Sequence, residues 1–364
     1  MKVALGNLGS LKYALKASLE DLDIEVCFSE PNTRLMYDHG ARYLPIEMCY
    51  PLKLLLGNYL SQLDQNPDVV IYYGGCDMCN LTPVNYAFND ILNDLNCCPD
   101  SYICRLNSKK DFVVSYYETL RKISGKSIFD IALSIKLGLK KYEAFNFIDQ
   151  VFYQIRPAFE NSDNVDSIYD SFYNRLIEVS DDCSLDKINN ELLEIHREYS
   201  VKVSYDTLKV GLIGDVYSLN EPYVHQYCDK KLGSLGVALD RWSTHRLVPE
   251  SDRRIQDKAC KRVSQLPEII QKDYGVFTDL EVKKIRRYVN RGFDGLIFIA
   301  PLECNPNDAL RNLINKVQIA LDIPVLTLLF DEHTSPLAVQ VRLEAFVDML
   351  NKRKALKYRN NRAL

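Results

Sequence analysis

The feature that most constrains the fold is a buried strand that runs into a glycine turn and is followed at once by a helix start. In Val69-Val-Ile-Tyr-Tyr-Gly-Gly-Cys-Asp-Met-Cys79, the first five residues predict the strand and the two glycines predict the turn. Thr82 and Pro83 then suit the cap and the first position of a helix. A strand that leads directly into a helix is typical of a parallel α/β sheet.

The same plan recurs at two other places, and each carries a cysteine. Cys49 comes just before a proline-started apolar helix, and Cys304 lies between a strand expected over 295–300 and a helix expected over 308–321. Helix starts offer N–H groups and a positive dipole end, which stabilise a thiolate. In open α/β sheets, ligands gather beyond the carboxyl ends of strands. The two cysteines and Cys79 are therefore candidate ligands of a soft metal site, either an iron–sulfur cluster or zinc.

Alternating strands and helices fill two separate parts of the chain. Residues 1–106 and 206–350 each predict a doubly wound parallel sheet of the Rossmann or flavodoxin type. Residues 107–205 form a helical insertion, whose many aromatics either pack the helices together or line a substrate pocket. Residues 351–364 are a basic tail, expected to be frayed and solvated, with contact to an acidic partner as the alternative.

Several elements are expected at particular places. The pattern predicts a strand over 24–29, a short helix over 31–37, a helix over 221–235 and a closing helix over 335–352. Asp331-Glu-His-Thr-Ser335 follows the last strand, so it either reaches the crevice beside Cys304 or caps the closing helix.

Composition excludes several classes of protein. A net charge of −4 over 364 residues gives no reason to expect nucleic acid, and no apolar run is long enough for a membrane span. The first residues predict a strand and not a signal peptide, so we expect a cytoplasmic protein whose eleven cysteines stay reduced. Four of these cysteines have sequence contexts that predict structural roles: Cys27, Cys183, Cys228 and Cys260.

The pair Cys76-x-x-Cys79 has three interpretations. A redox dithiol would open a helix, whereas Cys76 precedes its helix by several residues. A zinc site would recruit Cys97 and Cys98, or Cys104, although a whole helix separates them from the pair. An iron–sulfur site would take its other ligands from Cys49 and Cys304.

Four stretches occur in the order and spacing of one known family. They are Pro45-Ile-Glu-Met-Cys49-Tyr-Pro with Gly57-Asn58, Gly74-Gly-Cys-Asp-Met-Cys79, residues 210–222 with 231–236, and Pro301-Leu-Glu-Cys304-Asn-Pro306 with residues 330–348. The chain resembles the 2-hydroxyacyl-CoA dehydratase family, and most closely its stand-alone CoA protein activase members from anaerobic bacteria and archaea. The resemblance covers both α/β domains and is weak in the helical middle.

The resemblance implies a 4Fe–4S cluster held by Cys49, Cys79 and Cys304, with the fourth iron position open to water or substrate. In related dehydratases, a separate ATP-hydrolysing activase passes one low-potential electron to the cluster, and a ketyl radical then forms from a thioester. Some relatives bind a double-cubane cluster and reduce small molecules. The resemblance also allows a homodimer or a heterodimer with a related subunit.

The chain departs from the family pattern beside the second cysteine. Asp77 and Met78 replace a Gly-Pro pair, and Cys76 is an added thiol that is a fourth ligand, a ligand of a larger cluster or a bystander. We therefore expect an oxygen-sensitive iron–sulfur protein, either a dehydratase- or reductase-like enzyme or an electron-transfer component. The alternative is a non-enzymatic binding or scaffold protein with a structural zinc or no metal.

Overall fold

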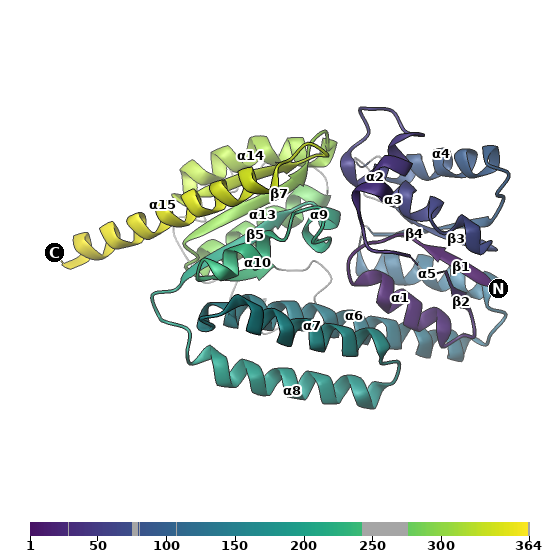
Figure 1. The fold of residues 1–364 in the computed structure, drawn as a ribbon, viewed down its shortest axis with the longest axis horizontal. Coiled ribbons are helices and arrows are strands. Elements are labelled where there is room, and N and C mark those ends of the chain that lie inside the picture. The colour runs from purple at the N-terminus through teal and green to yellow at the C-terminus, as the bar shows by residue number, and fades with distance from the viewer. Residues whose placement is uncertain (28, 75–78, 80, 107, 242–275, 363–364) are drawn as a thin grey trace. The chain divides into compact units, whose positions relative to one another are not determined.

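The computed structural model describes residues 1–27, 29–74, 79, 81–106, 108–241 and 276–362 (Figure 1). It is an α/β protein with two four-stranded parallel sheets, as the sequence predicts. The chain divides into two compact units, each built on one sheet. The first comprises Met1–Asn146, Asn174–Asn189 and Pro301–Pro306, and the second comprises Phe147–Tyr173, Asn190–Ala300 and Asn307–Leu364.

The sheet of the first unit has the strand order β2-β1-β3-β4. Its central strand β3 is buried at all six positions, which agrees with its continuous apolar sequence. The strand predicted over 24–29 is shorter among the described residues, where Glu25 and Val26 pair with β1. The elements are β1 (Lys2–Leu5), α1 (Leu11–Glu20), β2 (Glu25–Val26), α2 (Arg34–Ala41), α3 (Tyr50–Leu60), β3 (Val69–Gly74), α4 (Leu81–Asp94), β4 (Asp100–Arg105) and α5 (Lys109–Ile123).

The sheet of the second unit repeats that order as β6-β5-β7-β8. Strand β7 alternates between two cores: Ile297 and Ile299 pack with α10 and α15, whereas Leu296 and Phe298 pack with α13 and α14. Helices therefore cover both faces of this sheet, as in a doubly wound fold. The elements are β5 (Leu208–Gly214), α9 (Val216–Asn220), α10 (Cys228–Ser234), β6 (Val237–Arg241), α13 (Val276–Asn290), β7 (Gly295–Pro301), α14 (Asn305–Leu321), β8 (Val325–Phe330) and α15 (Pro336–Arg362).

The single helix predicted over 221–235 is wrong. The chain instead makes α9 and α10, with a turn between them that contains Gln226 at φ 52° and Tyr227 at φ 55°. A right-handed helix cannot pass through two left-handed residues. The Gln226 amide donates a hydrogen bond to the Thr334 carbonyl at 2.7 Å, so the turn is fixed to the loop after β8.

Other helices also differ from their predicted bounds. Helix α14 starts at Asn305, three residues before the start predicted at 308, and α4 starts at Leu81, so Thr82 is inside the helix and is not its cap. The helix predicted over 31–37 starts later, at Arg34, because Thr33 is extended and its hydroxyl accepts a hydrogen bond from the Met36 N–H at 3.4 Å. Helix α15 continues to Arg362, ten residues past the predicted end, so the basic segment is helical and not frayed. Among the described helices, none combines the length and the apolar composition that a bilayer crossing needs.

The middle of the chain is helical, as predicted, and is divided between the two units. Several of its aromatics pack inside, including Tyr116, Phe145 and Phe152, whereas Phe129 is 71% exposed. The packing interpretation of these aromatics therefore holds for those three residues. The helices are α6 (Ile128–Ile155), α7 (Ser162–Glu178) and α8 (Asp182–Ser200).

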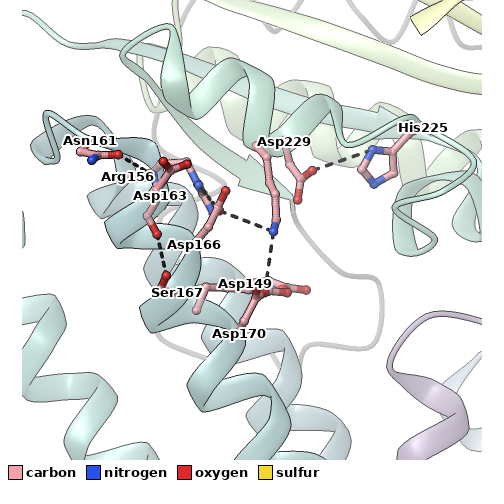
Figure 2. Close-up of polar contacts among 11 residues, drawn as sticks. Asp149, Arg156, Asn161, Asp163, Asp166, Ser167, Asp170, His225 and Asp229 are labelled. Carbon is pink, nitrogen blue, oxygen red and sulfur yellow. Dashed lines mark hydrogen bonds and ion pairs between the residues drawn. The ribbon is translucent and has the colours of Figure 1, made fainter. Parts of the chain in front are cut away.

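Buried charges join the helical residues of the second unit to its sheet. Asp149 of α6 accepts hydrogen bonds from Arg241 of β6 at 2.5 Å and from the Tyr169 hydroxyl at 2.8 Å. Desolvation raises the pKa of Asp149, and the adjacent Arg241 opposes that rise. Figure 2 shows a neighbouring contact, in which Asp166 of α7 binds Arg156, the residue just after α6, at 2.6 Å. Because the buried Asp149 carboxylate is paired with Arg241 and also bonded to Tyr169, these contacts constrain how α6 and α7 pack on this sheet.

Helices α2 and α3 cross in unusually close contact. A Cβ atom on Gly57 would lie 1.8 Å from the Met36 carbonyl oxygen, and one on Gly40 would lie 1.8 Å from the Lys53 carbonyl oxygen. Backbone therefore lies directly against backbone at both positions. Only glycine permits this approach, and the approach sets the position of α3 and of the loop that precedes it.

We predict that Gly57→Ala destabilises the protein by about 1–3 kcal/mol, the usual cost of overpacking a core. Helix propensity alone predicts the opposite sign, a gain of about 1 kcal/mol. Urea unfolding of the wild type and the variant measures the difference. A stabilised variant would contradict the close crossing.

A buried lysine caps the end of α7. The Lys141 ammonium donates hydrogen bonds to the Ile177 carbonyl at 2.8 Å and to the Val179 carbonyl at 2.6 Å. Desolvation lowers the pKa of Lys141 to about 8 from its usual 10.5. Because the unfolded chain then binds more protons than the folded chain between these two pH values, the contribution of Lys141 to stability rises with pH across that window.

We predict that the stability of the wild type relative to Lys141→Met rises between pH 8 and pH 10.5, because only the wild type carries this titration. Urea unfolding at several pH values measures that difference. Lys136→Met, at an exposed position of the same helix, is the control for removing a lysine charge. A flat profile for Lys141→Met would contradict the prediction.

Candidate metal centre

Cys49 lies at the start of the most deeply buried helix of the first unit. It is the N-cap residue of α3, in extended conformation with φ −61° and ψ 150°, and Pro51 lies in the first turn. All ten residues from Tyr50 to Tyr59 are buried. The Cys49 side chain is half-buried, so the thiol stands at a rigid helix start and keeps some access to solvent.

Lys53 places a positive charge one turn after Cys49. Its side chain is only 3% exposed, and its ammonium donates a hydrogen bond to the Ile46 carbonyl at 2.8 Å. This bond ties the loop before Cys49 to α3. A buried cation beside a helix start favours negative charge on a nearby thiol, as the helix dipole also does.

Buried amides connect α3 to the carboxyl end of β1. The Asn7 N–H donates to the Asn58 side-chain oxygen at 3.0 Å, and the Asn58 amide donates to the Asn32 side chain at 3.0 Å. The Gln62 side chain accepts from the Leu5 N–H at 3.2 Å and donates to the Leu5 carbonyl at 2.9 Å. These bonds fix the turn after β1.

Cys79 lies between β3 and α4. The Leu81 N–H, at the start of α4, donates to the Cys79 sulfur at 3.4 Å. The Asn85 amide donates to the Tyr73 carbonyl at 2.9 Å, so α4 is anchored to the end of β3. Cys79 is half-buried, and Cys76 lies outside the described residues.

Cys304 occupies the corresponding place in the second sheet. Two residues separate it from the end of β7, it immediately precedes α14, and its side chain is 9% exposed. Glu303 has a φ of 62°, which turns the chain sharply between the strand and the helix. The segment Pro301–Pro306 belongs to the first compact unit, the unit that contains Cys49 and Cys79.

Strand order gives Cys79 and Cys304 equivalent positions. In each sheet the chain begins on an interior strand, adds a neighbour on one side and then crosses to the other side. The strand order therefore reverses between β1 and β3 in one sheet and between β5 and β7 in the other. Ligands bind beyond the carboxyl ends of the strands at such a switch point. Cys79 follows β3 and Cys304 follows β7, so each thiol lies at the switch point of its own sheet.

The loop after β8 caps a helix. Asp331 accepts hydrogen bonds from the His333 N–H at 3.0 Å and from the Thr334 hydroxyl at 2.6 Å. Ser335 accepts from the Ala338 N–H at 3.5 Å, at the start of α15. The capping interpretation of this segment is therefore confirmed, and His333 is exposed.

The zinc site that combines Cys79 with Cys97 and Cys98 is excluded by the strand register. Asp100 pairs with Val69, so Cys97 and Cys98 lie at the amino end of β4. Cys79 instead follows the carboxyl end of β3, about 20 Å away along a six-residue strand. Cys104 is fully buried, and desolvation raises its pKa to about 12, which keeps it a thiol.

The cysteines expected to be structural differ in exposure. Cys27 and Cys228 are buried, and desolvation raises the pKa of Cys228 to about 12. Their core role is confirmed. Cys183 is exposed near the start of α8, so it is not a core residue, and Cys260 lies outside the described residues.

Comparison with known proteins assigns no function to this chain, so a function must be argued from the residues themselves. A scan against models of protein families found no match, and neither did a search of curated proteins.

Within the described part of the chain, no group of three or more His, Cys, Asp or Glu residues is arranged to hold a metal ion. Residues 75–78, which adjoin Cys79, fall outside that description.

Sequence reasoning identified the three cysteines but missed the buried polar residues that hold α3, the helix after Cys49, in place. Lys53 and Asn58 interrupt an apolar helical stretch, and sequence reasoning gave neither of them a supporting role, although both are buried. Asn7 and Gln62 are polar residues in ordinary positions, and only the fold shows that they hydrogen-bond to buried backbone and amides. A lysine or asparagine inside a fully apolar helical stretch is the signal that could have found the first two.

We predict a fixed order of thiol reactivity in the folded, metal-free protein. Exposed Cys98 and Cys183 should react first with iodoacetamide, and half-buried Cys49 and Cys79 should follow. Cys104 and Cys228 should stay unmodified even at pH 9, because burial raises the pKa of each thiol to about 12. Peptide mass spectrometry gives the order, with urea-unfolded protein as the control. Early labelling of Cys104 would contradict its placement.

Proposed function

We propose that this chain is an iron–sulfur protein whose Cys49, Cys79 and Cys304 hold a 4Fe–4S cluster. It would receive low-potential electrons from an ATP-dependent activase and use them in a reductive or radical reaction. The observation that supports this proposal is that each of the three thiols lies at or next to the start of a helix. Two of them hold equivalent switch-point positions, and all three belong to one compact unit.

The donor set fits such a cluster chemically. Thiolates are the ligands that iron–sulfur clusters use, and helix starts lower the pKa of the thiols that become those ligands. The negative charge of a thiolate-bound cluster needs compensation, which the dipoles of α3, α4 and α14 and the buried Lys53 would supply. The cluster would supply one-electron chemistry at low potential to a bound substrate.

The residues around the ligands have positioning roles in this proposal. Lys53 holds the loop before Cys49 through the Ile46 carbonyl, and Asn58 holds α3 against the turn after β1. The Leu81 N–H hydrogen bond to the Cys79 sulfur would strengthen the negative form of that ligand. Three thiolates leave one iron position for water or substrate, whereas a fourth ligand from Cys76 would close the site and favour electron transfer over substrate catalysis.

Metal analysis of anaerobically purified protein tests the proposal. We expect about four irons and four sulfides per chain, the composition of one cubane cluster. Roughly twice that content would indicate a double cluster, with Cys76 among its ligands. One zinc without sulfide would support the structural scaffold instead, because the same thiols suit zinc.

We predict that Cys49→Ala, Cys79→Ala and Cys304→Ala each reduce iron and sulfide to less than about a quarter of the wild-type content, because a site with two thiolates holds a cluster poorly. Cys183→Ala is the control for an exposed thiol, and Cys27→Ala is the control for a buried one like Cys304. Both controls should keep full iron. Full iron in all three ligand variants would overturn the assignment.

A further inference from the structure

Helix α15 carries apolar side chains on two opposite sides. The side that packs on the sheet of the second unit has Val339, Leu343, Phe346, Val347 and Leu350. The opposite side has four large apolar residues that are between 40% and 72% exposed: Leu337, Val341, Met349 and Leu356. Large apolar side chains that stay exposed together mark an interaction surface.

These exposed residues form a broad face, which we call the outer row. It consists of Leu337, Val341, Ala345 and Met349, at steps of four residues, and of Leu356, seven residues further on. Each step of four adds about 40° around a helix with 3.6 residues per turn, so the row turns through about 120°. A partner helix in a coiled coil would need a narrow seam that repeats every 3.5 residues. The outer row therefore fits a flat surface better than a second helix.

Cations flank the end of the outer row. Lys352 and Arg359 lie four residues before and three residues after Leu356, so they share its side of the helix, and both are exposed. Leu350 is the last buried residue among the described side chains of α15. The helix continues past the strands of its sheet to Arg362, as Figure 1 shows. These cations therefore stand clear of the core.

Positive charge predominates on α15, although the whole chain has a net charge of −4. The helix contains seven Lys and Arg residues, and its acidic residues are Glu344 and Asp348. Arg353 and Lys354 are paired with Asp322 and Asp294 at 2.6 Å and 3.4 Å, and both are only half-buried beside the sheet. Both acidic residues of the helix precede the basic segment, so its end is uniformly positive.

We propose that the outer row of α15 binds the surface of a bilayer that contains anionic lipids. The helix would lie in the plane of the surface, with its apolar side chains at the boundary between headgroups and acyl chains, as interfacial helices do. The row is about 28 Å long at 1.5 Å per residue, and Lys352 and Arg359 would contact lipid phosphates at its end. A nucleic acid would match these cations but would leave the apolar row without a partner.

Flotation of the full chain with phospholipid vesicles tests this proposal. We expect binding at 50 mM NaCl to vesicles of phosphatidylcholine with about 30% phosphatidylglycerol. Binding to phosphatidylcholine alone should be at least about tenfold weaker, because the cations then lack a counter-charge. Binding to the anionic vesicles should also fall at 0.5 M NaCl, since salt screens exposed charges.

Two variants separate the apolar contribution from the electrostatic one. L337S/V341S/L356S should weaken binding to the anionic vesicles by at least about tenfold, because the strength of interfacial binding scales with the buried apolar area. K352E/R359E should weaken it by at least about tenfold as well, since each cation near an anionic surface contributes about fivefold.

Matched controls alter similar residues elsewhere on the chain. L193S/V201S/I319S replaces three other exposed apolar residues, and K136E/K283E reverses two exposed cations on α6 and α13. Both controls should bind like the wild type, and circular dichroism should show every variant folded.

Three results would overturn the proposal. A wild type that binds neither kind of vesicle would leave the outer row to an acidic protein partner. Equal binding to both kinds of vesicle would remove the role of the cations. A loss of binding in the controls as large as in the α15 variants would show that the outer row is not the site.

Discussion

Parallel strand pairing is the constraint on which the rest of this structure depends. When all strands of a sheet point the same way, every strand delivers the loop that follows it to the same edge. Helices must then return the chain to the other edge, so each loop at the carboxyl edge leads into a helix start. Cys79 and Cys304 hold equivalent positions because both sheets have the same strand order, and not because their local sequences are alike.

Close packing of α3 is the second requirement. Glycine at position 57 brings the α3 backbone against the Met36 carbonyl, and the side chains of Asn58 and Gln62 then reach the backbone at the end of β1. Each buried amide has a hydrogen-bond partner, which avoids the cost of an unsatisfied polar group. Cys49 stands at the start of a helix that is fixed both by steric contact and by hydrogen bonds.

The second unit relies on buried charge in a different way. The pair of Asp149 and Arg241 lies between α6 and β6, and the Tyr169 hydroxyl adds a further hydrogen bond. Removing one member of such a pair leaves an uncompensated charge, so the pair constrains where α6 packs. The end of α15 shows the opposite case, in which Lys352, Lys357 and Arg359 stay exposed on the helix.

The sequence by itself determined the α/β class, the strands β3 and β7 and the presence of a helix after each of Cys49, Cys79 and Cys304, although not the exact start of α4 or α14. Apolar runs, glycine turns and prolines are local signals, and these elements depend mainly on local signals. The sequence did not determine the turn at Gln226 and Tyr227 or the full length of α15, because a helical pattern does not show left-handed residues or where a helix loses its support. Only the tertiary structure decided that Lys53 is buried beside Cys49 and that Cys97 and Cys98 lie at the edge opposite Cys79. Burial and strand register arise from contacts between distant residues, which no local pattern records.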